Sequence, residues 1–595
     1  MEPEGKHRNS IMKQRILAVF GLVEIVLRCT LTMNDFLGLM MQLEGSDNGA
    51  GSLEAPSSDP ESQSWSKSIS GHFQQAQICM DTRDTSTQVN GVPLSTVTDL
   101  ASSSYDAVIH VTYPQTASVR PVQALEDVIA SALELDKTLE KTPSVLFSSR
   151  VSGGRVVVSP TGTFTPYDDV RLVYEAARAG MEKAINAGAR RPILIVQSNP
   201  DFADADLVLL LGAFEQLYVP IEIREWFPEK RIKLESLGVY GEGLSRPLDA
   251  LLRNAVALEQ ARAVTRDIGA GDPERMTAQL VATYVRQEFA NSQVSVRVVD
   301  DIDTIRREYP LFAAVNRAAH VVERHRGNVI FLEYNPTSGT PEETVILVGK
   351  GITYDTGGAD LKTGGSMIGM SRDKSGAAAV AGFIKACDTL RPQIKVIGVM
   401  CMARNSIGEE SYVADELIVS RSGKTVRIGN TDAEGRMVMA DLLYEMKERA
   451  ANEVRPHIYT IATLTGHARL AAGNGYTIVM DNHVARASNH ASAFQESGDS
   501  IADMVEVSRM RPEDFAVHRG RGEGDDIYQA LNQPSAVTPR GHQGPAAFLM
   551  MVSDLHEGAV AYSHLDIAAS GGSIPERATG SPVLALAKHY KLIQF

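Results

Sequence analysis

The sequence predicts two α/β domains, a smaller N-terminal domain and a larger C-terminal domain with a central mixed sheet flanked by helices. Three observations predict this fold class. From about residue 75, short β-rich runs alternate with helical apolar spacing, which is typical of strands joined by helices. The chain has 595 residues, and a single hydrophobic core stops growing at about 250–300 residues. Residues 251–264 have the spacing of a helix that links two such regions.

Residues 1–70 fit neither domain, and we predict a disordered or atypical N-terminal extension. Residues 45–70 are rich in Ser, Gly, Asp and Pro and lack apolar periodicity. The apolar run at 16–23 loosely resembles a signal peptide, but Glu24 and Arg28 interrupt it. It is also far shorter than the segment needed to span about 30 Å of hydrocarbon. We therefore expect no membrane anchor.

The predicted N-terminal domain, residues 71–250, alternates strands and helices, which favours a mostly parallel sheet. The predicted strands are 107–113, 145–147, 156–158 and 193–196, and the predicted helices are 122–135, 170–185 and 206–217. No glycine-rich phosphate fingerprint opens any of these helices, so we expect no nucleotide site in this domain.

The predicted C-terminal domain, residues 251–595, continues the alternation. The predicted strands are 329–334, 345–348, 394–402, 458–464 and 478–480, and the predicted helices are 251–264, 377–387 and 438–446. The helix at 377–387 consists mainly of small residues, so we expect close packing against its neighbours.

Composition excludes several classes of protein. Hydrophobic residues make up 43% and charged residues 22%, which excludes collagen, coiled coil and wholesale disorder. The net charge of −15 opposes binding to nucleic acid or an anionic membrane. The four cysteines show no CxxC spacing, which excludes a disulfide scaffold and favours a reducing, cytoplasmic compartment.

Acidic and basic residues gather in three segments beside predicted strands and helices, where open α/β sheets usually place their sites. The segments are VGKGITYDTGGADLK at 348–362, MSRD at 370–373 and NTDAEGR at 430–436. In the first, a strand runs into a Gly-rich turn and leaves Lys350, Asp355 and Lys362 at its end.

Single residues of these segments also have ordinary structural explanations. Asp373 could favour a helix start through the helix dipole, and Thr431 with Glu434 has the spacing of a capping box. Two details favour a site instead. Arg436 lies at a helix start, where a cation opposes the dipole unless it holds an anion. The first segment also concentrates opposite charges beside a buried strand.

Carboxylates from separated segments can converge on divalent cations. Two cations about 3.5–4 Å apart can activate a water and polarise a carbonyl. Oxygen ligands suit Mn, Mg or Zn rather than a thiolate metal. A lysine ligand must be neutral, so the metal has to displace its proton.

Together the three segments resemble the leucyl aminopeptidase family, the M17 di-metal aminopeptidases, and NTDAEGR is the signature of that family. The resemblance continues through ATLTG at 462–466 and HLDIA at 564–568 and covers roughly residues 250–595. The preceding α/β segment resembles the smaller N-terminal domain of the family, with weaker motifs.

The resemblance implies a catalytic C-terminal domain that removes an apolar, leucine-like residue from the N-terminus of short peptides. It assigns five metal ligands: Lys350, Asp355, Asp373, Asp432 and Glu434. One divalent ion would use the lysine, Asp355, Asp373 and the glutamate. The other would share Asp355 and Glu434 and add Asp432. Mn or Zn is the expected metal, with Mg or Co as alternatives.

The resemblance also implies the remaining roles. Lys362 and Arg436 match the two catalytic positions: the lysine would stabilise the developing oxyanion, and the arginine would hold a bicarbonate that acts as general base. The residues that resemble the pocket for the first side chain are Met370, Thr463 and Gly466. We interpret His467, His542 and His564 as structural, because oxygen ligands suffice.

Three places depart from the family pattern. They are Ala359-Asp360-Leu361 before the catalytic lysine, Lys374-Ser375-Gly376 after the second motif, and DIGAGDP at 267–273. These departures bear on substrate preference and subunit contacts more than on metal chemistry, and they suggest a divergent branch.

Two other classes of function stay open from the sequence. One is a catalytically weak family member that acts as a scaffold or regulator, although none of the seven matched positions is lost. The other is a two-metal phosphatase, which would not explain the joint match of three motifs. The family forms hexamers around an inner cavity, so we expect a homohexamer that admits only short peptides.

Overall fold

The computed structural model describes residues 88–114, 122–572, 574 and 577–595. All described residues belong to one compact unit, residues 83–595. The predicted extension at 1–70, its apolar run at 16–23, and two of the cysteines, Cys29 and Cys79, lie outside the described residues.

The first sheet has seven strands in the order β1-β2-β7-β6-β3-β5-β4. In that order the strands are Gln88–Val89, Val92–Thr96, Leu237–Glu242, Pro192–Gln197, Ala107–Thr112, Arg155–Pro160 and Ser144–Phe147. The five central strands are parallel and the two edge strands antiparallel. Its helices are α4 (Gln123–Leu135), α5 (Arg171–Asn186), α6 (Ala205–Glu215) and α7 (Ile221–Trp226). The strands and helices predicted for 107–217 are confirmed.

The second sheet has eight strands in the order β16-β15-β18-β14-β10-β11-β9-β8. In that order they are Val505–Val507, Thr477–Asp481, Ala561–Asp566, Pro456–Ala462, Thr344–Asp355, Lys395–Asn405, Asn328–Tyr334 and Ser295–Val299. Strands β18, β14, β10 and β11 are parallel, whereas β9 and β15 run antiparallel to their neighbours β11 and β18. The predicted mixed sheet is therefore confirmed.

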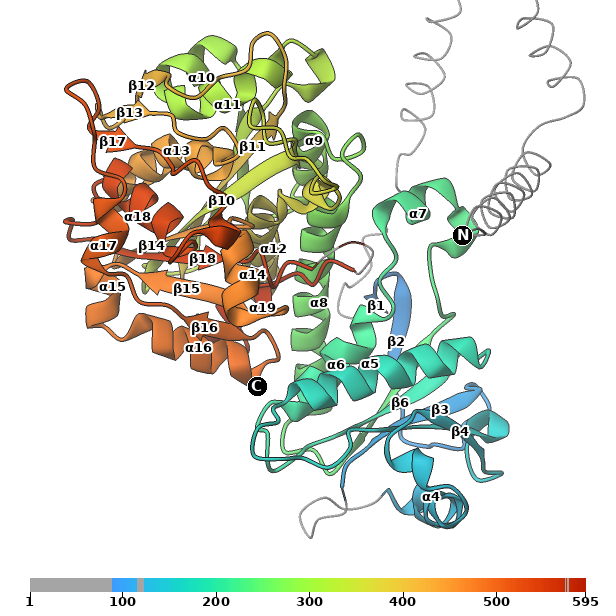
Figure 1. Ribbon diagram of the computed structural model, residues 1–595. Helices are drawn as coiled ribbons and strands as arrows, with labels where there is room; N and C mark the ends of the chain where they lie inside the picture. The colour runs from blue at the N-terminus through green and yellow to red at the C-terminus, as the bar shows by residue number, and fades with distance from the viewer. Residues whose placement is uncertain (1–87, 115–121, 573, 575–576) are drawn as a thin grey trace, which may run out of the picture. The chain divides into compact units, whose positions relative to one another are not determined.

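Helices cover both faces of the second sheet (Figure 1). Along β10, Val345 and Leu347 share a core with α12 (Ser375–Leu390), while Ile346 and Val348 share a core with α13 (Glu434–Ala450). Successive strand residues point to opposite faces, so this alternation places one helix on each side. The architecture is therefore three-layered around β10.

Shorter elements surround these layers. The other helices are α8 (Leu248–Ala270), α9 (Ala278–Glu288), α10 (Ile302–Glu308), α11 (Pro310–His320), α14 (Gly466–Ala472), α15 (His483–Ala487), α16 (His490–Ser500), α17 (Pro512–Ala516), α18 (Gln543–Val552) and α19 (Val583–His589). A three-stranded sheet consists of β12 (Leu417–Val419), β13 (Thr425–Arg427) and β17 (Ile527–Tyr528).

Strand β10 is longer than predicted, and this corrects the expected position of Lys350. The Gly-rich stretch does not begin a turn, because Gly349 and Gly351 lie within the strand. A Cβ at Gly349 would lie 2.5 Å from Ala377 Cα, and one at Gly351 would lie 2.5 Å from Met402 Sδ. These glycines allow close packing, and the turn begins only after Asp355.

The linking helix is also longer than predicted. Helix α8 continues to Ala270 and contacts both α6 and α12. The predicted helix ended at residue 264, before the charged residues Arg266 and Asp267. Arg266 and Asp267 are nevertheless buried, since each has partners in the folded chain.

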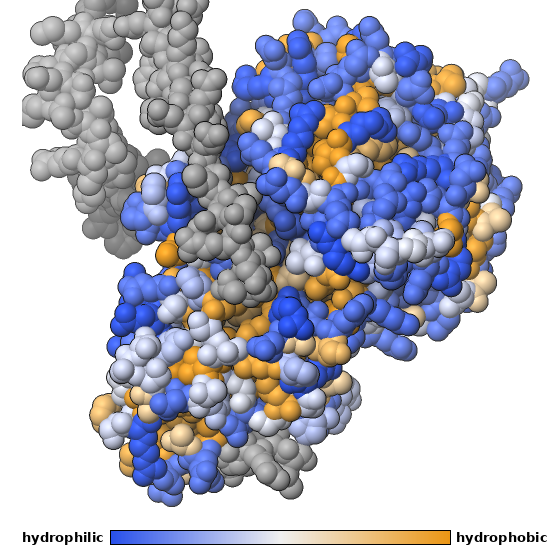
Figure 2. Space-filling model, turned by 180° about the vertical axis from the view of Figure 1, so that it is seen from behind, coloured by the Kyte–Doolittle hydropathy of each residue, from blue (hydrophilic) through white to orange (hydrophobic). Residues whose placement is uncertain are grey.

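No helix in the described part of the chain is long and apolar enough to cross a membrane. On the face shown in Figure 2, hydrophobic residues form separate patches within a mostly hydrophilic surface.

Candidate active site

The predicted site residues converge at the carboxyl edge of the parallel strands in the second sheet. Asp355 ends β10, and Thr463 directly follows β14. Because β10 and β14 are parallel neighbours, their ends meet at one edge. Asp373 immediately follows the 3-10 helix Met370–Arg372, near the start of α12, and Glu434 is the first residue of α13.

Lys350 organises one half of the site. Its Nζ lies 2.8 Å from Asp373 Oδ1 and 2.8 Å from Glu434 Oε1, and it donates a hydrogen bond to the carbonyl of Thr463 at 3.1 Å. The Thr463 hydroxyl donates to Asp373 Oδ1 at 2.7 Å. Helix α13 can approach the lysine only because residue 435 is glycine: a Cβ there would lie 2.5 Å from Lys350 Cε.

Lys362 organises the other half. Its Nζ lies 3.0 Å from Asp355 Oδ2 and also contacts Asp432 Oδ1. The second oxygen of Asp355 accepts hydrogen bonds from Asn405 Nδ2 at 2.8 Å and from the Gly357 amide at 2.9 Å. Both carboxylate oxygens of Asp355 therefore have partners.

The two halves share a cluster of carboxylates. Oxygens of Asp355, Asp432 and Glu434 all lie within 4.8 Å of one another. Asp373 Oδ2 and Glu434 Oε2 are buried and accept no hydrogen bond from the described part of the chain. A buried carboxylate oxygen without a donor is costly, and a bound cation would remove that cost.

Burial and the neighbouring charged groups shift the pKa values of the site residues. Burial, followed by the charges of Asp355 and Glu434, raises the pKa of Asp432 to about 7. Burial also raises the pKa of Asp373 well above its usual range. Burial alone would lower the pKa of Lys350 and Lys362, but the neighbouring carboxylates raise both above their usual range. The site therefore favours bound positive charge.

Arg436 lies in the first turn of α13, two residues after Glu434. Its Nη1 donates to the carbonyl of Gln529 at 3.1 Å, and its Nε is buried without an acceptor in the described chain. Burial lowers the pKa of Arg436 to about 10. A buried guanidinium with an unused donor can hold an anion.

The three predicted pocket residues lie on two segments: Thr463 and Gly466 follow β14, and Met370 lies in the 3-10 helix before Asp373. Thr463 touches Asp373 and Lys350 directly, as described above. Met370 is half-buried in the 3-10 helix that precedes Asp373. Gly466 is the exposed first residue of α14.

The three histidines interpreted as structural all have side-chain contacts. His564 is fully buried, with its Nδ1 2.7 Å from Thr460 Oγ1. His467 and His542 pair through their Nδ1 atoms at 2.7 Å.

Sequence reasoning missed the residues that support the carboxylates. Thr431 does not form the expected capping box, because α13 begins after Ala433, which makes no side-chain cap. The Thr431 hydroxyl instead donates to the carbonyl of Gly357 at 2.7 Å. Asn405 bridges Asp355 and the carbonyl of Thr431. Both residues are fully buried polar side chains, and no sequence spacing marks such partners.

Comparison with known proteins identifies similar chains. Residues 263–587 match the model of the cytosol aminopeptidase family, catalytic domain. A Caenorhabditis elegans protein named as an aminopeptidase is 43% identical over 503 residues, which cover 82% of this chain and 96% of the relative. A Chlamydia trachomatis serovar A protein named "Probable cytosol aminopeptidase" is 32% identical over 367 residues, covering 60% and 68% of the two chains.

Two solved structures share the fold. The leucyl aminopeptidase of Trypanosoma cruzi aligns with a TM-score of 0.69 at 21% identity and covers 85% of this chain and 98% of that one. The bottromycin maturation enzyme BotP in complex with Mn aligns with a TM-score of 0.67 at 21% identity and covers 82% and 99% of the two chains.

Proposed function

The chain belongs to the cytosol aminopeptidase family, M17, and on that basis we propose that it uses two divalent cations to release the N-terminal residue of short peptides. The single observation that carries the metal proposal is the carboxylate cluster at the carboxyl edge of the second sheet. Four carboxylates face only two lysines there, which leaves two formal negative charges in excess.

The residues present fit a pair of metal ions. Asp373 Oδ2 and Glu434 Oε2 are buried and lack donors in the described chain, as metal-ligand oxygens would. One ion would be held by Lys350, Asp355, Asp373 and Glu434, and the other by Asp355, Asp432 and Glu434. Oxygen ligands suit Mn, Mg and Zn. The related fold of BotP is known in complex with Mn, which supports Mn as the first metal to test.

When bound, the two cations supply the Lewis acidity that polarises the scissile carbonyl and lowers the pKa of a water. Lys350 would have to lose its proton to act as a ligand, and the metal provides the driving force for that loss. The carbonyl of Thr463 and the carboxylate of Asp373 keep its Nζ at this position.

Lys362 would stabilise the negative charge that develops on the substrate carbonyl oxygen. Its ammonium group is held beside Asp355 and Asp432, so it is positioned before the reaction begins. Arg436 would hold a bicarbonate. That bicarbonate would accept a proton from the attacking water and transfer it to the leaving amine. The buried, unused Nε of Arg436 supports this role.

The preference for an apolar, leucine-like first residue is also a proposal. Met370, Thr463 and Gly466 would line the pocket for that side chain. We further propose a cytoplasmic homohexamer that admits only short peptides, and family membership is what supports both statements. Light scattering tests the oligomer: a mass of six chains is expected, and a monomer would contradict it.

An assay of wild-type protein, first stripped with a chelator, tests the reaction class. Leucine anilide should be cleaved after addition of Mn, Zn, Co or Mg, whereas N-acetyl-leucine anilide should resist because its amine is blocked. A phosphate ester serves as the comparison substrate. Preferred hydrolysis of that ester would contradict the proposal, and failure to cleave any anilide or short peptide would favour the scaffold function.

A further inference from the structure

We propose that Asp360 is a positioning residue that holds the turn carrying Asp432 against the loop carrying Lys362, and so maintains one half of the metal site. This inference rests on the proposed function of the site. It deepens that function by giving a role to a residue that departs from the family pattern and is neither a predicted ligand nor a predicted catalytic group.

Asp360 and Thr431 make three polar contacts with each other. Asp360 Oδ2 accepts from the Thr431 amide at 2.7 Å and lies 3.1 Å from its hydroxyl, and the Asp360 amide donates to that hydroxyl at 2.7 Å. A hydrogen bond to an ionised acceptor is roughly twice as strong as a neutral one. Thr431 immediately precedes Asp432 in the chain, so fixing the backbone of Thr431 restricts where the Asp432 carboxylate can lie.

The loop at 355–362 is closed around the Thr431 side chain. The Lys362 amide donates to the carbonyl of Thr356 at 2.9 Å. Gly357 has φ +89°, and a Cβ there would lie 2.4 Å from the Asp360 carbonyl oxygen, so only glycine permits the closure. A fully buried Thr431 fills this loop, and its hydroxyl reaches the Gly357 carbonyl at 2.7 Å.

The same turn is held from its other side. The carbonyl of Thr431 accepts from Tyr412 Oη at 2.8 Å and from Asn405 Nδ2 at 3.2 Å. Asn405 also donates to Asp355 at 2.8 Å. Asp355, Lys362 and Asp432 are therefore placed relative to one another by one continuous network, to which Asp360 adds a fourth charged side chain.

The other half of the site has a different support. Thr463 donates to Asp373 at 2.7 Å, and its carbonyl accepts from Lys350. The two supports are far apart in sequence and share no residue. Loss of Asp360 should therefore weaken the ion that needs Asp432, while loss of the Thr463 hydroxyl should weaken the ion that needs Asp373.

The test is a count of Mn ions bound per chain, by equilibrium dialysis of the full chain. Wild type should bind two. Asp360→Ala should bind one of the two about 10–100-fold more weakly, the usual effect of removing a residue that orients a ligand, and the other, which also uses Asp355, should weaken by a clearly smaller factor. Its kcat for leucine anilide should fall more than its KM rises. Asp360→Asn keeps an acceptor for the Thr431 amide and should restore most of the affinity.

Four further variants separate this role from a general effect on folding. Thr431→Val, which removes the hydroxyl but keeps the side-chain shape, should reproduce the loss seen in Asp360→Ala, and the double variant should lose little more. Thr463→Val should weaken the other ion. Asp301 accepts from the Thr304 amide at 2.9 Å where α10 begins, so Asp301→Ala removes a similar contact and should leave both ions unchanged.

Two equally tight ions in folded Asp360→Ala and Thr431→Val would overturn this inference and leave the proposed function intact. Equal weakening of both ions would also overturn it. A wild-type chain that binds no Mn would overturn the proposed function itself, and this inference with it.

Discussion

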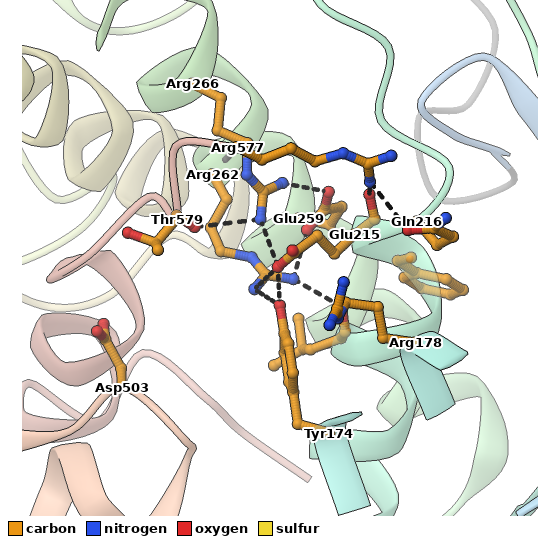
Figure 3. A network of polar contacts seen from close by, with 12 residues as sticks. Tyr174, Arg178, Glu215, Gln216, Glu259, Arg262, Arg266, Asp503, Arg577 and Thr579 are labelled. Carbon is orange, nitrogen blue, oxygen red and sulfur yellow. Dashed lines mark hydrogen bonds and ion pairs between the residues drawn. The ribbon is translucent and has the colours of Figure 1, made fainter. Parts of the chain in front are cut away.

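Two clusters of buried charge in this chain have opposite characters. The first, which we call the lysine–carboxylate cluster, contains Lys350, Lys362, Asp355, Asp373, Asp432 and Glu434. The second, which we call the arginine–glutamate cluster, contains Glu215, Glu259, Arg262 and Arg266 (Figure 3). The first has an excess of negative charge and the second is formally neutral.

Most donors of the arginine–glutamate cluster bond within the protein, although Arg262 Nε has no acceptor among the described residues. Arg266 donates to Glu259 at 2.7 Å, to Glu215 at 3.2 Å and to the carbonyls of Ala578 and Thr579 at 3.0 and 3.1 Å. Arg262 donates to Tyr174 Oη at 2.6 Å and pairs with Glu259 at 2.5 Å. This cluster therefore joins α5, α6 and α8 to the segment before α19.

The difference between the two clusters indicates how a structural charge cluster can be distinguished from a binding site. Both clusters are buried and both contain lysine or arginine beside carboxylates, so burial and pairing alone do not separate them. What separates them is charge balance: the arginine–glutamate cluster is formally neutral, although Arg262 Nε has no acceptor in the described chain, whereas the lysine–carboxylate cluster keeps two formal negative charges in excess. The imbalance is what a cation would correct.

The largest expected effect comes from Asp355→Ala, because Asp355 contributes to both proposed ions. Hydrolysis of leucine anilide should fall to the background rate, and Mn should no longer be retained. The metal-free variant should still fold, since Lys362 keeps Asp432 as a partner and Asn405 keeps the carbonyl of Thr431. Measurable metal-dependent activity would remove Asp355 from the ligand set.

Lys362→Ala should give the next largest effect. The variant should keep its metal but lose about 10²–10³-fold in kcat, the typical cost of one preorganised group that stabilises an oxyanion. Metal content and kcat are measured on the same preparation. If metal is lost in parallel with the rate, Lys362 maintains the site instead of acting on the substrate.

Arg266→Met tests the structural cluster. Removal of Arg266 leaves Glu215 and Glu259 to share Arg262 and should cost about 3–5 kcal/mol of unfolding free energy in urea. Arg150→Met is the matched control, because Arg150 pairs with Asp127 and their side chains are 67% and 80% exposed, and such pairs are worth about 0–1 kcal/mol. Equal losses in both variants would erase the distinction between a buried and an exposed pair.

Each bound Mn ion should raise the unfolding free energy by less than Arg266→Met lowers it. At a free Mn concentration of 100 times Kd, one site contributes about 2.7 kcal/mol. Folded Arg266→Met should gain the same increment as wild type, since distant sites are nearly additive. Asp355→Ala should gain none. An increment lost in Arg266→Met would show that the two clusters are coupled.

A limited part of this comparison could be predicted from the sequence. Every member of the lysine–carboxylate cluster stands in a short motif, so the motifs reveal the site. Their geometry was predicted less well: Lys350 was expected beyond a strand end but lies inside β10, because Gly349 and Gly351 serve packing rather than a turn. Local composition does not distinguish these two uses of glycine.

The supports and the structural cluster could not be predicted for a different reason. Asp360 and Thr431 are 71 positions apart, and Arg266 and Thr579 are 313 apart. Such contacts depend on how the elements pack, which spacing along the chain does not contain. The predicted helix over 251–264 also stopped short of Arg266, which lies in the same helix and is buried in the folded chain.

The most direct test of the account is the number of Mn ions retained by wild type, Glu434→Ala and folded Arg266→Met after dialysis against buffered free Mn. Glu434 belongs to both proposed ions, whereas Arg266 belongs to the structural cluster. If the proposed ligand set is correct, wild type and Arg266→Met bind two Mn ions per chain and Glu434→Ala binds none. Two ions in Glu434→Ala would contradict it, because the metals would then be bound elsewhere.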